Sequence, residues 1–94
     1  MITVCIDRDA CSLRMDGHAE YAEPGQDIVC AAATILAYAL AQRLSGIAQA
    51  RIDMAEGHAY IQARANGDTL AALDTVACGF ELLAAKYPEN IRYR

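Results

Sequence analysis

The sequence predicts a single α+β domain over residues 1–94, in which two helices pack against an antiparallel sheet built from two hairpins. Two observations lead to this fold class. Apolar and polar residues alternate in two pairs of neighbouring segments, which is the pattern of half-buried strands. Each pair is followed by an apolar segment long enough to form a helix. The expected element order is therefore β-β-α-β-β-α, and residues 91–93 could add a short closing strand.

The strands are expected in two hairpins. Residues 2–6 and 11–15 alternate on either side of a polar turn. Residues 49–54 and 59–65 alternate around a Glu-Gly pair at 56–57, which is the signal of a tight turn. Because every second residue of these strands is apolar, one face of the sheet is expected to be buried.

Two helices are expected after the hairpins. Asp27 is placed to cap the first one, because an Asp side chain accepts hydrogen bonds from first-turn N–H groups. This helix is expected to end near Gly46 in a left-handed glycine, and it is apolar enough between 28 and 41 to be buried on most sides. The second helix is expected to begin at residues 66–68 and to end near Lys86, shortly before a proline.

The chain is acidic, with a net charge of −4 and no basic run. Affinity for nucleic acid depends largely on neutralising phosphates, so direct nucleic-acid binding is not expected and a basic protein or peptide partner is favoured. The uncharged run at 28–41 is shorter than the ~20 residues that span a bilayer. The first residues lack the basic start and apolar core of a secretory signal. We therefore expect a cytoplasmic protein without membrane contact.

A chain of 94 residues has a small core, so a homodimer is expected to bury additional apolar surface. One stripe of the second helix, containing Ala71 and Leu82, is a candidate for this interface. A reducing compartment keeps cysteines as thiols. No C-x-x-C pair is present, so no metal and no cofactor is expected. The cysteines expected to be free are Cys5, Cys11, Cys30 and Cys78.

Three reactive residue types occur close together: His18, Asp27 and Cys30. If Asp27 caps the first helix, Cys30 is its third residue, and its sulfur lies near unpaired N–H groups and the positive end of the helix dipole. That position stabilises a thiolate. His18 could then pair with the thiolate while Asp27 orients the imidazole, and the free first-turn N–H groups could hold an oxyanion.

Each of these residues also has an ordinary structural interpretation. A cysteine in an alanine-rich helix is commonly a small buried apolar residue, and an Asp before an apolar run is commonly only a cap. A non-catalytic dimeric binding module is therefore an alternative. Thiol transfer is another, and it would need a partner cysteine such as Cys11 near Cys30. His58, beside the second tight turn, is expected to be an exposed turn histidine.

The segment that holds the three reactive residues resembles the ribosomal-processing cysteine protease family (Prp). The resemblance rests on Gly-His-Ala at 17–19, a glycine at 25 and Asp-Ile-Val-Cys-Ala-Ala at 27–32. It implies a small cysteine endopeptidase, commonly a homodimer, that removes the N-terminal extension of a large-subunit ribosomal protein. Related forms trim phage structural proteins.

The same resemblance implies a role for each residue of the site. Cys30 corresponds to the nucleophile, His18 to the general base and acid, and Asp27 to the assisting carboxylate. Thr34 stands where the family commonly has serine, and it keeps the hydroxyl group.

The surroundings of the site are acidic. Residues 15–42 contain no Lys or Arg. The loop at 19–26 is therefore expected to be negative and to close over a bound peptide, and attraction would favour a basic substrate. The four acids of this stretch are Asp16, Glu20, Glu23 and Asp27.

Overall fold

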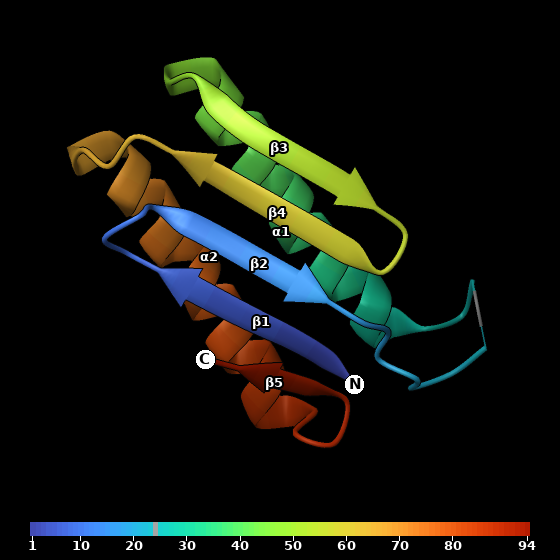
Figure 1. Cartoon of the computed structure of the whole chain (residues 1–94). Helices are drawn as coiled ribbons and strands as arrows, with labels where there is room; N and C mark the ends of the chain where they lie inside the picture. The colour runs from blue at the N-terminus through green and yellow to red at the C-terminus, as the bar shows by residue number, and fades with distance from the viewer. Residues whose placement is uncertain (24) are drawn as a thin grey trace.

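The computed structural model describes residues 1–23 and 25–94, and over this part the chain forms two helices and one five-stranded sheet (Figure 1). Pro24, in the loop expected at 19–26, lies outside the described residues. In chain order the elements are β1 (Ile2–Asp7), β2 (Ser12–Asp16), α1 (Ile28–Ile47), β3 (Ala50–Ala55), β4 (His58–Ala63), α2 (Gly67–Lys86) and β5 (Ile91–Tyr93).

The predicted α+β fold class and element order are confirmed, and the closing strand is present. The strands lie in the order β3-β4-β2-β1-β5. The two hairpins are antiparallel, and so is the β2–β4 pair that joins them. β5 pairs with β1 in parallel, so the sheet is mixed. α2 carries the chain back across the sheet, and β5 therefore runs in the same direction as β4.

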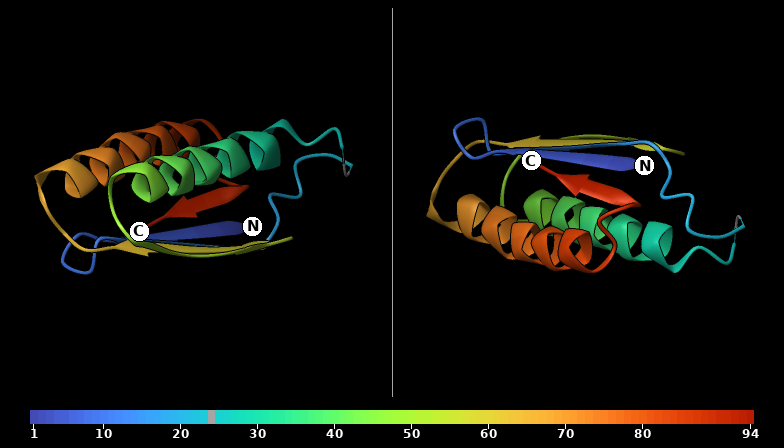
Figure 2. Two further views of the ribbon diagram at one scale, coloured as in Figure 1. Left: turned by 90° about the horizontal axis from the view of Figure 1, so that it is seen from above. Right: turned by 90° about the horizontal axis from the view of Figure 1, so that it is seen from below.

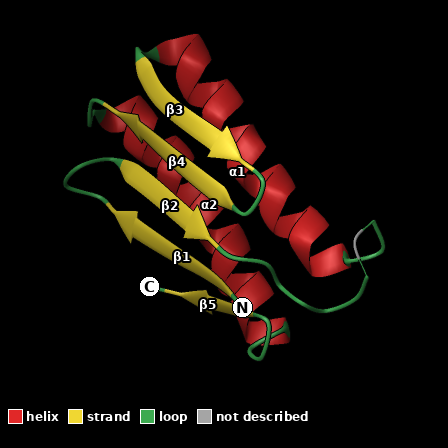
Figure 3. Cartoon of the chain, turned by 45° about the vertical axis from the view of Figure 1, so that its right-hand side comes forward, coloured by secondary structure: helices red, strands yellow, loops and turns green. Residues whose placement is uncertain are grey.

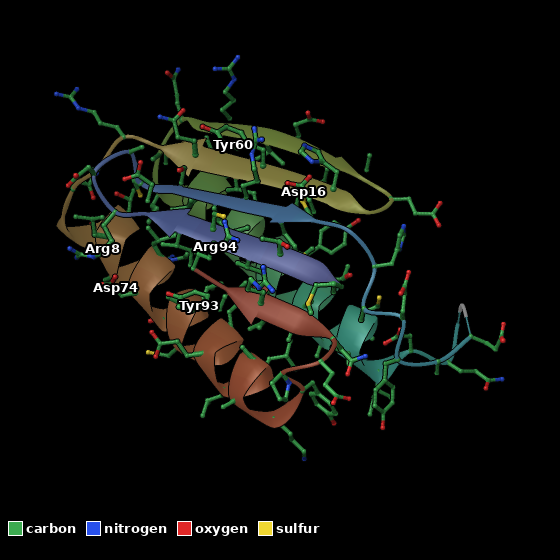
Figure 4. The ribbon with its side chains drawn as sticks, turned by 60° about the horizontal axis from the view of Figure 1, so that its bottom comes forward. Arg8, Asp16, Tyr60, Asp74, Tyr93 and Arg94 are labelled. Atoms are coloured by element: carbon green, nitrogen blue, oxygen red, sulfur yellow. The ribbon has the colours of Figure 1, made fainter. Side chains whose placement is uncertain are left out.

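The helices cover one face of the sheet and leave the other face open, as the two views of Figure 2 show. The prediction of a buried apolar face is wrong for β3, an edge strand in which Ile52 is 42% exposed. It is confirmed for β1, β2 and β4, because their apolar positions point toward the helices. Val4, Leu13 and Ile61 are fully buried there. Tyr60 and Asp16 lie on the open face (Figure 4).

The prediction that α1 is buried on most sides is wrong. Ile28, Ile35 and Tyr38 are more than half exposed, because α2 and the sheet cover only one side of α1. The predicted glycine ending is also wrong: α1 continues through Gly46, and Ala48 caps it in extended conformation. By length and composition α1 could span a membrane, a test that core helices of soluble proteins also pass, and its buried side belongs to the core.

α2 begins and ends as predicted. Asn66 caps it and Thr69 completes a capping box. Leu73 and Phe80, on the side of α2 that faces the core, are fully buried against the rest of the fold. The opposite side of α2 faces solvent, where Leu82 is 73% exposed.

Candidate active site

Asp27 caps α1, as predicted. Its Oδ1 accepts hydrogen bonds from the N–H groups of Val29 at 3.0 Å and Cys30 at 2.9 Å. Its carbonyl oxygen accepts the N–H of Ala31 at 3.1 Å. The expectation that free first-turn N–H groups hold an oxyanion is therefore wrong for these three, because Asp27 already occupies them.

Asp27 also ties the preceding segment to the helix. Its Oδ2 accepts the N–H groups of Tyr21 at 2.9 Å and Ala22 at 3.4 Å. Burial alone would raise the pKa of Asp27, but the hydrogen bonds from Cys30 and from the two loop N–H groups outweigh it, and the pKa lies below its usual value. The carboxylate is therefore held ionised beside the cysteine.

Cys30 is the third residue of α1 and is half-buried at the edge of the core. Its Sγ accepts the backbone N–H of Ala19 at 3.2 Å. Ala19 is only 1% exposed, so water competes little for this N–H group. An N–H group directed at sulfur at the amino end of a helix stabilises a thiolate.

His18 directly precedes Ala19, whose N–H group contacts the Cys30 sulfur. Its ring packs against the β3–β4 turn, where a Cβ added at Gly57 would lie 2.8 Å from His18 Nε2. Gly17 donates to the Gly57 carbonyl at 2.9 Å and so fixes the backbone before the histidine. Among the hydrogen bonds of the described residues, none joins the His18 ring to Cys30 Sγ.

One cleft of about 1080 Å³ brings the three predicted residues together. Its walls are the segment between β2 and α1, the first turns of α1 and the β3–β4 turn, which lie at one end of the fold (Figure 3). The described residues that line it include no Lys or Arg, which agrees with the acidic surroundings expected from the sequence. Its polar lining includes His18, Glu20, Asp27, Cys30, Thr34 and Glu56.

His58 also lines the cleft, with contacts that were not predicted from the sequence. It is half-buried rather than exposed, its Nδ1 lies 2.6 Å from Asp16 Oδ1, and its Nε2 lies 3.7 Å from Asp53 Oδ2. Asp16 and His58 face each other because β2 pairs with β4. That pairing joins the two hairpins, and alternation within each hairpin does not predict it.

The four cysteines are free, as expected for a reducing compartment. Cys11 is buried and Cys78 is exposed, while Cys5 and Cys30 are half-buried. Within residues 1–23 and 25–94, no three His, Cys, Asp or Glu side chains are placed to hold a metal ion.

Comparisons of sequence and of structure with known proteins identify the same family, the cysteine protease Prp. The family model described as cysteine protease Prp matches residues 1–92. Proteins named Ribosomal processing cysteine protease Prp, from two Staphylococcus aureus strains, are 31% identical over 97 residues, which covers 97% of this chain and 92% of theirs.

Two crystal structures of Prp from S. aureus match the whole chain and 98% of their own. The complex with a covalently linked product peptide has a TM-score of 0.88 at 29% identity. The complex with a substrate peptide has a TM-score of 0.81 at 27% identity. A Streptococcus mutans structure shares the fold, with a TM-score of 0.71 at 22% identity over 99% of this chain and 90% of that one.

Proposed function

This chain belongs to the cysteine protease Prp family, and from that premise we propose that Cys30 is its nucleophile, His18 its general base and acid, and Asp27 its assisting carboxylate. One observation carries this assignment. Cys30 Sγ lies in the first turn of α1, accepts an N–H group and opens into a cleft that His18 and Asp27 also line. No other described cysteine combines a helix N-terminus with this cleft.

The reaction is peptide-bond cleavage through an acyl-enzyme. The Cys30 thiolate attacks the scissile carbonyl carbon, and the carbonyl π electrons move to the oxygen. As the C–N bond breaks, His18 donates a proton to the leaving amine, and it then takes a proton from the water that hydrolyses the thioester. The N–H group of Ala19, which already points at the sulfur, supports the developing oxyanion.

His18 must approach the sulfur before it can act. Its ring now rests on the β3–β4 turn, while the backbone on either side of it is fixed at Gly17 and Ala19. Rotation of the side chain, with closure of the loop over a peptide, brings the ring to Cys30. Such closure also excludes water from the reacting atoms.

The substrate is a basic protein segment. The named relatives are ribosomal processing proteases, and the S. aureus crystal structures hold substrate and product peptides. The cleft of this chain carries acidic groups at Glu20, Asp27 and Glu56. We take the N-terminal extension of a large-subunit ribosomal protein as the substrate, because ribosomal proteins are basic and an acidic cleft attracts them. Processing of a phage structural protein is the alternative substrate.

The acting species is a cytoplasmic homodimer in this proposal. The exposed stripe of α2 that contains Ala71 and Leu82 supplies the apolar surface. Burial of this stripe across a two-fold axis would compensate for the small core of one chain. Sedimentation equilibrium tests the dimer: Leu82→Glu should produce monomers if this stripe is the interface, and an unchanged mass would exclude it.

The function is tested by incubating the chain with a large-subunit ribosomal protein that carries its N-terminal extension, and by mapping the products by mass spectrometry. The wild type should release the extension. Cys30→Ala should be at least about 10³-fold slower, because the covalent step is lost. Cys5→Ala, which removes another half-buried thiol, should cut at the wild-type rate. Equal cleavage by Cys30→Ala and the wild type would overturn the assignment in favour of a non-thiol activity.

A further inference from the structure

We propose that Asn90, in the turn between α2 and β5, is a positioning residue of this site. Its side-chain amide holds the Ala19 carbonyl and so keeps the Ala19 N–H group directed at Cys30 Sγ. The role in catalysis rests on the proposed function, while the effect on the sulfur is measurable without any substrate.

Two hydrogen bonds define the arrangement. Asn90 Nδ2 donates to the Ala19 carbonyl oxygen at 3.0 Å, and the Ala19 N–H group donates to Cys30 Sγ at 3.2 Å. Both polar groups of Ala19 are therefore engaged, so the two peptide planes that meet at its Cα are fixed. Ala19 is almost fully buried, and loss of the Asn90 contact would leave its carbonyl without a good substitute.

Asn90 is itself held by the body of the fold. Its N–H group donates to the Tyr87 carbonyl at 3.0 Å, and its own carbonyl accepts the N–H group of Ile2 at 2.9 Å. These contacts join the end of α2 to the start of β1. The amide that reaches Ala19 therefore projects from a fixed backbone rather than from a free loop.

A second contact holds the same segment to the same turn. The rings of Tyr21 and Tyr87 pack edge to face, with centroids 5.4 Å apart and an interplanar angle of 78°. The segment that follows His18 is thus attached to the α2–β5 turn at Ala19 and at Tyr21. The side chain of His18 can move, while the N–H group beside it stays in place.

The chemistry of the contact explains why an amide is needed. A carbonyl oxygen needs a donor, and the Asn90 amide supplies one without a charge. If the donor is lost, the Ala19 peptide can rotate, the N–H group moves off the sulfur, and both thiolate and oxyanion lose a hydrogen bond.

The test compares Asn90→Ala and Asn90→Leu with the wild type. Leu keeps the branched shape and the number of heavy atoms of the Asn side chain without the donor, and Ala removes the side chain beyond Cβ. Agreement between the two variants therefore assigns the effect to the hydrogen bond. The matched control is Gln62→Ala, which removes another hydrogen bond from a side-chain amide to a loop carbonyl. Gln62 Nε2 donates to the Ala10 carbonyl oxygen at 3.4 Å. Thermal unfolding of all four proteins is measured to compare their stability.

The primary readout is the rate of Cys30 alkylation by iodoacetamide at neutral pH, followed by peptide mass spectrometry. Both Asn90 variants should react about tenfold more slowly than the wild type, because the reactive sulfur loses the hydrogen bond from the Ala19 N–H group. With a peptide substrate, kcat should fall about tenfold while KM stays within about twofold, because the donor acts on the transition state. Gln62→Ala should change neither quantity.

The two proposals fail in different ways. An alkylation rate and a kcat that match Gln62→Ala in both Asn90 variants would overturn the role of Asn90, whatever the substrate is. Slower alkylation in both Asn90 variants, together with no cleavage of any peptide by the wild type, would keep the positioning of the sulfur and overturn the protease function.

Discussion

α1 and α2 have equal lengths of 20 residues, and each follows a hairpin and begins at an Asp or Asn cap. They differ at the third residue. In α2 this residue is Thr69, whose buried hydroxyl accepts the Asn66 N–H at 2.9 Å and donates to the Arg64 carbonyl at 2.7 Å. In α1 it is Cys30, whose sulfur accepts the N–H group of Ala19, in the segment before the helix, and faces the cleft.

The connections that lead into the helices explain the difference. Residues 64–66 link β4 to α2, and in this short link the cap residue Asn66 exchanges hydrogen bonds with Thr69 of the same helix end. Residues 17–27 link β2 to α1, and this longer segment brings His18 and Ala19 to the first turn. The same capping chemistry therefore stabilises a helix end in one place and supports a reactive thiol in the other.

The largest effect that separates the two ends is expected from removing their caps. Asp27→Ala should lower kcat/KM by about 10²-fold or more, because it releases the loop and removes the carboxylate beside Cys30. Asn66→Ala should leave kcat/KM near the wild-type value and lower the unfolding free energy by about 1 kcal/mol, the usual cost of a lost cap. Peptide cleavage and urea unfolding measure the two effects.

The proposed difference between the two helix ends is contradicted if both cap variants lose activity in proportion to their loss of stability. Both ends would then be structural, and the carboxylate of Asp27 would have no part in the chemistry.

A second prediction concerns the glycine that supports the His18 ring. Gly57→Ala should reduce kcat/KM by about tenfold, because a Cβ there would lie 2.8 Å from His18 Nε2 and would crowd the space in which the ring must turn toward Cys30. Gly25→Ala is the control, since Gly25 also has positive φ and lines the cleft, but no atom lies within 4 Å of its added Cβ. Steady-state cleavage should separate the two variants, and equal losses would show that backbone strain alone is responsible.

The smallest effect is expected on stability, when low pH protonates the Asp27 carboxylate. The pKa of Asp27 lies below its ordinary value of 3.8 in the folded chain, so its ionised form stabilises the fold. That contribution is fully present above the ordinary pKa and is lost as the pH falls through the lower folded value. Asn caps a helix almost as well as Asp but does not titrate. Asp27→Asn also loses the Oδ2 contacts with Tyr21 and Ala22, so the contribution of the charge is measured from how the difference between the two proteins changes with pH.

The difference in unfolding free energy between wild type and Asp27→Asn should therefore shrink as the pH falls from 6 to below 3.8. Urea unfolding at a series of pH values measures it. A difference that stays constant over this range would mean that the hydrogen bonds to Asp27 do not favour its ionised form.

Periodicity predicted the elements well, because alternation and capping are local. Asp27 as the cap and Cys30 as the third helical residue followed from the same local signals. The exposure of Ile35 and Tyr38 could not be predicted, since it depends on how many layers cover α1. The contact of Asn90 with Ala19 was also out of reach, because it joins residues 71 positions apart through the β1–β5 pairing.

The central claim is that its place in the first turn of α1, beside the Ala19 N–H group, makes Cys30 the reactive thiol. Competitive alkylation tests this claim most directly. The wild type is treated with limiting iodoacetamide at neutral pH and mapped by mass spectrometry. Exposure alone favours Cys78, which is exposed, over the half-buried Cys30. We predict that Cys30 is modified first. Faster or equal labelling of Cys78 would contradict the account.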